Sequence, residues 1–380
     1  MLRIDATTLK KMIISENLLI EGIIPPIESK FVTEFRVKNK FYYSVQNNTE
    51  LLLAQNKIIS DILSKVELNN SAFAFIKNKS YLDFFEPHMG NYNFVRIDIQ
   101  NFFHSIHTPQ LKEILSHYFK DEFIDPNKKQ KIISSFMNLI TFNIPLSSKN
   151  QNSKNNNILP IGFTTSPIIS NIYMRDFDIK MQDFCIRHNI TYSRYADDML
   201  FSSTEQSSFV LSDAFMKEVS ILLNLKKLKI NTSKTIKKKH TISLNGYTIS
   251  SSLIVDGKVI SPAEFRISNK KTAIIRKFIL LSKKEKITSR YIMEKLFHFD
   301  KNKVHFLFPP KDKFIESYCN TLLVNKIKGY RSYIISLIKN AKKYNNTNEN
   351  TIKKYQEIIL ELNIYLDKNP LKNFSENKKT

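Results

Sequence analysis

The stretch that most constrains this chain is Tyr195-Ala196-Asp197-Asp198, which stands between two short apolar runs, 191–194 and 199–203. An apolar run, a tight turn and a second apolar run predict a β-hairpin, here with both acids at its tip. Two adjacent carboxylates in an apolar setting repel each other and resist desolvation. A bound metal cation would compensate their charge. The alternative is an ordinary solvated turn.

Two stretches upstream also place polar or flexible residues within apolar sequence. Residues 94–99 form an apolar run that contains Asp98, and an acid inside a buried strand is costly unless it is paired or bound to a metal. Residues 159–167 read Leu-Pro-Ile-Gly-Phe-Thr-Thr-Ser-Pro. The glycine, Gly162, permits a close backbone approach. Ser166 and Pro167 predict the start of a helix, with Ser166 as the N-cap.

In this order, the three stretches resemble the palm motifs of reverse transcriptases: an aspartate strand, a Pro-Gly-Ser-Pro loop that enters a helix, and Tyr-x-Asp-Asp. The resemblance covers roughly residues 30–340. It implies an α+β right-hand polymerase with fingers, a palm made of an antiparallel sheet plus helices, and a helical thumb. The implied parts are an N-terminal region with fingers (1–93), a palm (94–250, with a fingers segment around 120–160), a primer-grip hairpin with thumb (251–370) and a disordered tail (371–380).

The resemblance also implies a chemistry, in which a primer 3′-hydroxyl attacks the α-phosphorus of a deoxynucleoside triphosphate. Two Mg²⁺ ions about 4 Å apart assist such a displacement, and Mg²⁺ prefers hard oxygen ligands. The family pattern assigns metal binding to Asp98, Asp197, Asp198 and the backbone carbonyl of Ile99. It places Lys234 beside the leaving pyrophosphate, either as a general acid or as a phosphate contact.

Five residues are expected to contact the incoming nucleotide. Phe103 falls where the family places a steric gate against the sugar C2′, which favours deoxynucleotides; a core position is the alternative. Lys77 and Lys79 are candidates for holding the triphosphate, or ordinary surface lysines. Gly162 and Ile161 belong to the loop that approaches the nucleotide or template. Most relatives carry Gln at the position of Ile161, which leaves untemplated or protein-primed synthesis open.

A wider set of residues is expected to contact nucleic acid. Clustered lysines can track a phosphate backbone, a glycine turn resembles the primer grip, and lysines with tyrosines at helical spacing suit a thumb helix on a heteroduplex. The candidates are His88, Tyr195, Gly246, Lys237, Lys238, Lys239, Lys328 and Arg331. For His88, a structural histidine is the alternative.

Composition is compatible with this interpretation. Lys and Arg number 58 against 35 Asp and Glu, a net charge of +23, which suits a polyanion such as nucleic acid; a lysine-rich genome would give the same excess. Cys185 and Cys319 are far apart and fit a reducing cytoplasm. No apolar run approaches the roughly 20 residues of a membrane span. We therefore expect a cytoplasmic protein without a membrane partner.

Within the family, the short length points to bacterial retrons and related phage-defence enzymes. A retron enzyme would use a structured non-coding RNA as template and primer, consume deoxynucleotides and make a branched RNA–DNA product; an effector protein is left open as a further partner. The near alternative is a non-retron defence enzyme with protein-primed or untemplated synthesis. A non-catalytic RNA-binding scaffold is the third possibility, against which the three retained acids argue.

Apolar spacing and turn residues also predict the secondary structure. Strand and turn are expected at 31–45, a hairpin at 253–260, and a mobile loop at 147–157. Helices are expected at 49–66, 111–119, 128–139, 166–188, 207–225, 263–282, 290–299, 314–340 and 351–366.

Overall fold

The computed structural model describes residues 3–13, 18–45, 49–256, 258–301 and 310–369. Its contacts divide the chain into two compact units, Met1–His88 with Asn93–Lys238, and Met89–Tyr92 with Lys239–Thr380. The predicted boundaries of fingers, palm and thumb stay predictions. The predicted disordered tail, 371–380, lies outside the described residues.

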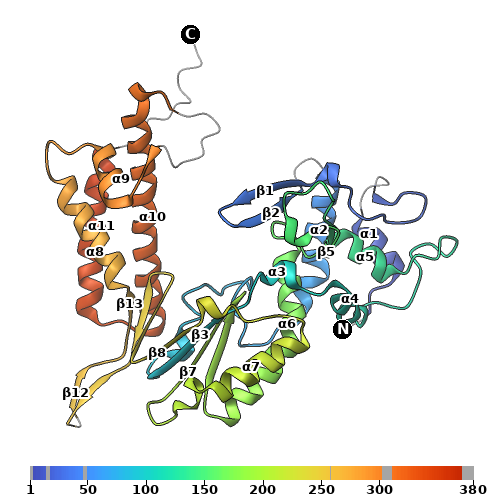
Figure 1. The fold of residues 1–380 in the computed structure, drawn as a ribbon, viewed down its shortest axis with the longest axis horizontal. Helices are drawn as coiled ribbons and strands as arrows, with labels where there is room; N and C mark the ends of the chain where they lie inside the picture. The colour runs from blue at the N-terminus through green and yellow to red at the C-terminus, as the bar shows by residue number, and fades with distance from the viewer. Residues whose placement is uncertain (1–2, 14–17, 46–48, 257, 302–309, 370–380) are drawn as a thin grey trace. The chain divides into compact units, whose positions relative to one another are not determined.

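The largest sheet of the first unit has four strands (Figure 1). Its strands lie in the order β6 (Thr191–Tyr195), β7 (Asp198–Ser203), β3 (Asn93–Asp98) and β8 (Ile236–Lys239). Both β6 and β3 pair with β7 in antiparallel register. The predicted hairpin around Tyr195–Asp198 is therefore confirmed, and β3 is its neighbour.

Two helices, α6 (Ser166–Arg187) and α7 (Asp213–Leu225), pack against one face of this sheet. The ring of Phe201 on β7 lies 5.1 Å from that of Phe215 on α7, and the Tyr192 hydroxyl on β6 donates to Asp178 on α6. Because side chains alternate along a strand, the apolar residues Val95 and Ile97 face this core, and Arg96 between them faces away.

The remaining elements of the first unit are short helices and hairpins. They are α1 (Ala6–Met12), α2 (Thr49–Asp61), α3 (Phe102–Ser105), α4 (Thr108–Ser116), α5 (Ile132–Ile140), the pair β1 (Thr33–Val37) and β2 (Lys40–Ser44), and the pair β4 (Phe142–Asn143) and β5 (Asn157–Ile158). The strands predicted at 31–45 and the helices predicted at 49–66, 111–119 and 128–139 are confirmed within a few residues at their ends. The predicted mobile loop, 147–157, contains a 3₁₀ turn, Gln151–Ser153.

The second unit combines small antiparallel sheets with long helices (Figure 1). Strands β9 (Thr241–Leu244), β10 (Tyr247–Ser250) and β13 (Glu264–Ile267) form one sheet, and β11 (Leu253–Val255) with β12 (Lys258–Ser261) forms the predicted hairpin. The helices are α8 (Asn269–Ser282), α9 (Ser289–Phe297), α10 (Ile315–Tyr344) and α11 (Glu349–Lys368). The predicted α+β class, with antiparallel sheets and a helical C-terminal part, is confirmed.

Two local predictions were wrong. The helix expected at 263–282 begins only at Asn269, because Glu264–Ile267 forms β13, whose alternate residues Phe265 and Ile267 are buried against β10. Ser166 is not the N-cap of α6. Thr165 occupies that position without a side-chain cap, while the Ser166 hydroxyl donates to the carbonyl of Pro160 at 2.7 Å.

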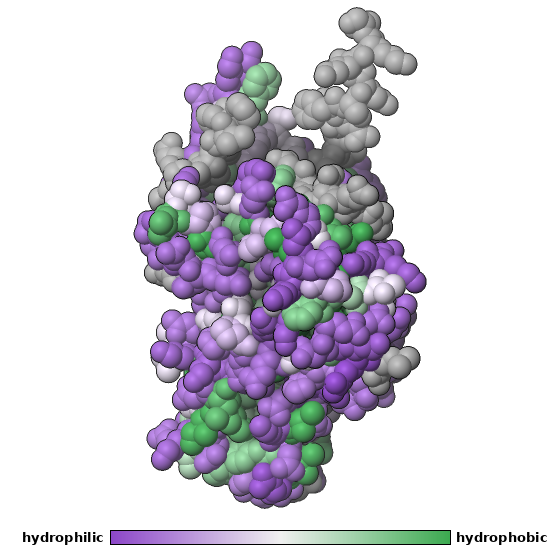
Figure 2. Space-filling model, turned by 90° about the vertical axis from the view of Figure 1, so that its right-hand side faces the viewer, coloured by the Kyte–Doolittle hydropathy of each residue, from purple (hydrophilic) through white to green (hydrophobic). Residues whose placement is uncertain are grey.

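The surface and the cysteines agree with the composition. The face drawn in Figure 2 is mostly hydrophilic. Cys185 and Cys319 are free thiols and both are buried. Among the helices in the described part of the chain, none is both long enough and apolar enough to cross a bilayer.

Candidate active site

The sheet brings three acids to one of its ends. Asp98 is the last residue of β3, and its register partner is Asp198, the first residue of β7. Asp197 lies between them in the turn, where its carbonyl accepts a hydrogen bond from the amide of Ile99 at 3.0 Å. The backbone thus joins the end of β3 to the hairpin tip, and the acids predicted to act together are neighbours.

Two cations and an amide surround Asp98. Arg96, two residues earlier on the same face of β3, contacts both Asp98 (3.3 Å) and Asp198 through Nη2. Lys234 Nζ lies 3.3 Å from Asp98 Oδ1, and Asn231 Nδ2 donates to the same oxygen at 3.1 Å. We did not predict Arg96 from the sequence, although the two-residue alternation of a strand would have placed it beside Asp98.

The two strands leave Asp198 only 9% exposed. Burial raises the pKa of its carboxyl to about 6, and the negative charges of Asp197 and Asp98 add to this rise, while Arg96 opposes it. The ionised form of Asp198 is therefore unfavourable in the protein alone, because Arg96 does not fully compensate for burial and for the neighbouring acids. Such a carboxylate gains from a nearby cation.

The donor set fits a hard metal cation. Asp98, Asp197 and Asp198 supply carboxylate oxygens of the kind that Mg²⁺ prefers, and the Arg96 guanidinium already places positive charge against two of them. Among the described residues, no three His, Cys, Asp or Glu side chains are already gathered as a metal-binding group.

A pocket of about 830 Å³ opens beside these acids. Its lining is mostly polar and cationic: Lys40, Lys227, Lys229 and Lys234, with Asn39, Phe41, Gln100, Asn101, His104, Ser105, Asn150, Ile161 and Asn231. Apart from Ile161 and Lys234, none of these residues was among the predicted contacts. Lys40 lies on the β1–β2 hairpin, and its place in the pocket depends on tertiary packing that local patterns do not reveal.

Ile161 and Phe103 lie at or near this pocket. The amide of Ile161 donates to Nε2 of His104 at 3.4 Å, and burial lowers the pKa of His104 to about 4, with Lys40 adding to the decrease. Phe103 is partly buried, and its ring lies 5.3 Å from that of Phe102 and 6.2 Å from that of Phe75. It precedes the pocket residue His104 directly in α3.

Gly162 is held against β2 of the first unit. Its φ of +116° is one that residues with a side chain rarely adopt, and a Cβ there would clash with the carbonyl oxygen of Tyr43. The close approach is therefore to the protein's own backbone. Whether Gly162 also approaches the nucleotide stays a prediction.

This crowding predicts that Gly162→Ala lowers the free energy of unfolding by about 2 kcal/mol, since both the backbone angle and the Tyr43 carbonyl oppose a methyl group. Urea denaturation would measure it. Gly329→Ala is the matched control, because Gly329 lies within α10 with nothing near its added Cβ; alanine there is expected to be neutral or slightly stabilising. Equal effects of the two substitutions would contradict the prediction.

The two candidate lysines of the 72–79 segment differ in their surroundings. Lys77 is exposed. Lys79 donates to the carbonyls of Ala72 (3.0 Å) and Asn70 (3.3 Å), and its ammonium lies 4.4 Å from the ring centre of Phe73. Neither lines the pocket described above, so their contact with a triphosphate stays a prediction.

His88 and Tyr195 are held by the protein itself. His88 is fully buried between Ser202 (Nδ1, 2.6 Å) and Ser193 (Nε2, 2.7 Å), and burial lowers its pKa to about 3. These contacts are those expected of a structural histidine, the alternative to a nucleic-acid contact. Tyr195 is partly exposed, and its ring makes an edge contact with Tyr81 at 4.8 Å.

The other candidates for nucleic-acid contact are divided between the two units. Lys237, Lys238 and Lys239 are exposed along β8, and Lys237 also pairs with Asp213. In the second unit, Gly246 occupies the β9–β10 turn with a φ of +88°. Lys328 and Arg331 lie on α10, where Lys328 is exposed and Arg331 donates to Asn363. Their roles stay predictions.

Comparison with known proteins gives one family. Residues 44–249 match the family model described as reverse transcriptase (RNA-dependent DNA polymerase). Among curated proteins, the chain is 30% identical over 197 residues to Retron Ec83 reverse transcriptase of Escherichia coli, covering 51% of this chain and 60% of that protein. It is 30% identical over 194 residues to Retron Ec73 reverse transcriptase of the same species, covering 48% and 58%.

The match spans only part of each relative, about 60% of the length of these two proteins. A solved structure of telomerase from Candida albicans, in complex with a fragment of telomeric RNA, covers 92% of this chain and 66% of its own at 11% identity, with a TM-score of 0.41.

Proposed function

Because the chain belongs to the reverse transcriptase family, we propose that it is an RNA-directed DNA polymerase of the retron type. The observation that carries this proposal is the meeting of Asp98, Asp197 and Asp198 at one end of the sheet, beside a lysine-lined pocket. A carboxylate with no ligand to bind would not be expected to lie buried beside other acids, as Asp198 does. Such acids are expected in a site that binds cations and a polyanionic substrate.

In this proposal, two Mg²⁺ ions would lower the pKa of the primer hydroxyl and neutralise charge on the triphosphate. The carboxylates of Asp98, Asp197 and Asp198, with the Ile99 carbonyl, would hold them. Arg96 balances part of the acidic charge in the free protein, which keeps the acids close together before substrate arrives. A ready-positioned charged site needs little rearrangement when the reaction begins.

The pocket suits the triphosphate. Lys40 comes from the β1–β2 hairpin, while Lys229 and Lys234 come from the segment that follows α7. Lysines act as point charges toward phosphates, so cations from two segments that line one pocket would hold a triphosphate chain. Lys234, 3.3 Å from Asp98, would lie closest to the reacting phosphate and could protonate the leaving pyrophosphate.

The steric-gate proposal for Phe103 gives a prediction about sugar selection. Phe103→Ala is expected to raise the use of ribonucleotides relative to deoxynucleotides at least about 10-fold, because a methyl group leaves room for a 2′-hydroxyl. Single-nucleotide incorporation with each sugar would measure the ratio. Phe75→Ala is the control, since it removes the neighbouring ring, 6.2 Å away, and leaves the gate. An unchanged ratio in Phe103→Ala would contradict the steric-gate proposal and favour the alternative, in which Phe103 is a core residue.

The finer parts of the proposal come from likeness to retron enzymes. The template, and also the primer, would be a structured non-coding RNA, and the product a branched RNA–DNA molecule that serves antiphage defence. The basic strand β8 and helix α10 would contact the nucleic acid. A cytoplasmic location belongs to the same proposal, because both cysteines are free thiols, as a reducing compartment allows. An effector protein is left open as a further partner.

The test is to purify the protein with the nucleic acid that it carries and to add Mg²⁺ with labelled deoxynucleotides. Asp197→Asn would be run in parallel, and Asp183→Asn, an exposed acid on α6, would serve as the matched control. The products would be treated separately with RNase and with protease. A product that requires Asp197 and shortens with RNase is the expected result.

Other outcomes would favour the alternatives. A product that shifts only with protease would mean protein priming, which the isoleucine at position 161 of the pocket lining keeps open. If neither the wild type nor Asp197→Asn made DNA while a specific RNA co-purified, the protein would be an RNA-binding scaffold and the proposed chemistry would be wrong.

A further inference from the structure

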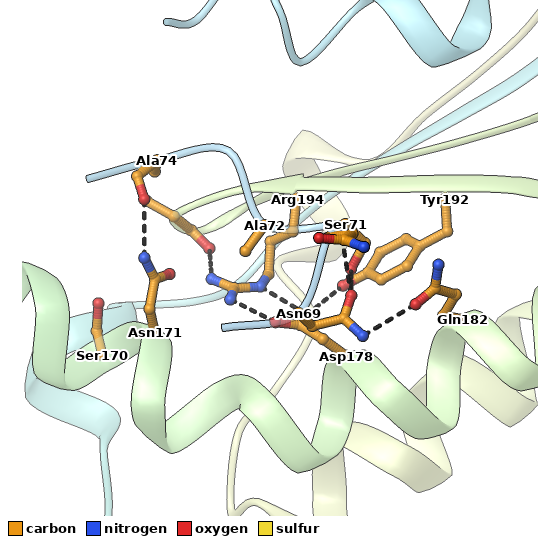
Figure 3. A network of polar contacts seen from close by, with 12 residues as sticks. Asn69, Ser71, Ala72, Ala74, Ser170, Asn171, Asp178, Gln182, Tyr192 and Arg194 are labelled. Carbon is orange, nitrogen blue, oxygen red and sulfur yellow. Dashed lines mark hydrogen bonds and ion pairs between the residues drawn. The ribbon is translucent and has the colours of Figure 1, made fainter. Parts of the chain in front are cut away.

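One arginine of the catalytic hairpin points into the core. Arg194, on β6, is fully buried on the face of the sheet that packs against α6. Its guanidinium makes two hydrogen bonds to Asp178 of α6, Nε to Oδ1 at 2.8 Å and Nη2 to Oδ2 at 2.6 Å (Figure 3). Asp178 is itself only 1% exposed. A buried ion pair of this kind is often no more stabilising than apolar side chains of the same volume, so stability alone does not explain it.

The same guanidinium holds the turn that carries the acids. Arg194 Nη1 donates to the carbonyl oxygen of Ala196 at 3.1 Å. Ala196 comes directly before Asp197, and its φ of +56° lies in the left-handed region. A residue with a Cβ is unfavourable there, and a hydrogen bond to its carbonyl compensates for part of that cost.

Arg194 is also tied to the segment of residues 71–74. Its backbone amide donates to the carbonyl of Ser71 at 2.7 Å, and its carbonyl accepts from the amide of Phe73 at 2.8 Å. Asn171 of α6 donates to the carbonyl of Ala74 at 2.8 Å (Figure 3). The arginine is therefore held through its backbone by the 71–74 segment and through its side chain by α6, and its Nη1 contacts the turn.

We propose that Arg194, anchored by Asp178, is a positioning residue that fixes the Ala196-Asp197 turn in the geometry needed for metal binding and catalysis. It acts through the Ala196 carbonyl and touches neither the substrate nor the reacting atoms. The proposal rests on the proposed polymerase function for its kinetic effect, and on the geometry of the turn for its effect on metal binding.

The test removes both charges together, because a single substitution would leave one buried charge without a partner. The variant is Arg194→Met with Asp178→Leu. The matched control is Arg187→Met with Asp183→Leu, the same two changes in an exposed pair on the same helix, α6. Thermal unfolding would check that both variants fold. Arg194→Lys is a second variant, since one ammonium keeps the charge beside Asp178 and cannot also span to the Ala196 carbonyl.

Three readouts separate positioning from mere stability. In primer extension, kcat is expected to fall at least 30-fold in the Arg194 variants, with KM for the deoxynucleotide within 3-fold of the wild type and the control unchanged. Binding of Mn²⁺ alone, followed by electron paramagnetic resonance, is expected to weaken at least 10-fold. Adding Ala196→Gly to the double variant is expected to recover at least 5-fold in kcat, because glycine adopts a positive φ without strain.

The proposal is overturned if the Arg194 variants fold and keep wild-type kcat and Mn²⁺ affinity. Failure of the wild type to extend any primer would count against the polymerase function instead. In that event, equal Mn²⁺ affinity in the wild type and the Arg194 variants would overturn the positioning role, and weaker affinity in the variants would support it.

Discussion

Asp98→Asn is expected to lower DNA synthesis by about 10³-fold or more, equivalent to roughly 4 kcal/mol of lost transition-state stabilisation. Asparagine keeps the shape of the side chain but removes the charge that a bound cation needs. The carboxylate now accepts from Asn231 and contacts Arg96 and Lys234, so the substitution also releases two cations from their partner. We expect the loss in kcat rather than in nucleotide binding.

The fold should tolerate this change. Asp98→Asn loses charge-assisted hydrogen bonds, but it also removes a negative charge close to Asp198, and the two effects oppose each other. The free energy of unfolding is expected to change by less than about 2 kcal/mol. Asp183→Asn, on the exposed face of α6, should leave activity unchanged. A folded Asp98→Asn protein with more than a tenth of wild-type activity would contradict the assignment.

Local sequence patterns predicted the end of the sheet that carries the three acids, because its determinants are short-range. The hairpin of β6 and β7 was predicted from two short runs that flank a two-residue turn. The family resemblance then placed Asp98 beside it, and the register of β3 with β7 agrees. The family match confirms that resemblance over residues 44–249.

What the sequence did not predict depends on contacts between distant segments. Arg194 has the alternation of a core position, yet its partner Asp178 lies on α6, sixteen residues away. Lys40 reaches the pocket only because the β1–β2 hairpin folds beside the segment around Lys229. A charged residue at a core position of a strand was the available signal for Arg194, since such a charge needs a buried partner.

The error at 263–282 has a similar origin. Phe265 and Ile267 are two residues apart, which is the strand period, but the apolar residues that follow them repeat at helical spacing. A short run next to a long helix is easily joined to it, and only pairing with β10 separates the two.

The second large effect concerns the stability of the metal-free protein. The pKa of Asp198 is raised to about 6 in the folded chain. Between about pH 4 and pH 6, Asp198 is therefore protonated in the folded state but ionised in the unfolded state. The free energy of unfolding should therefore fall as the pH rises through this window, by about 3 kcal/mol, because the pKa is raised by about two. Well above pH 6, where Asp198 is ionised in both states, the full loss of stability is present.

Asp198→Asn should remove this cost. At pH 8 in the presence of a chelator, we expect the variant to be more stable than the wild type by roughly 1–2 kcal/mol, the gain being reduced by the lost contact with Arg96. At pH 4 the advantage should disappear, since Asp198 is then protonated and uncharged. Urea denaturation at pH 4, 6 and 8 would measure the difference between the two proteins at each pH.

The control for this prediction is Asp213→Asn, because Asp213 is a fully exposed acid at the start of α7. Its difference from the wild type should stay near zero at all three pH values. Mg²⁺ is expected to stabilise the wild type more than Asp198→Asn at pH 8, since a cation relieves the repulsion that the substitution has already removed. A stability difference between Asp198→Asn and the wild type that does not change with pH would mean that Asp198 carries no such cost. The proposal that buried negative charge at the hairpin tip destabilises the metal-free protein would then be wrong.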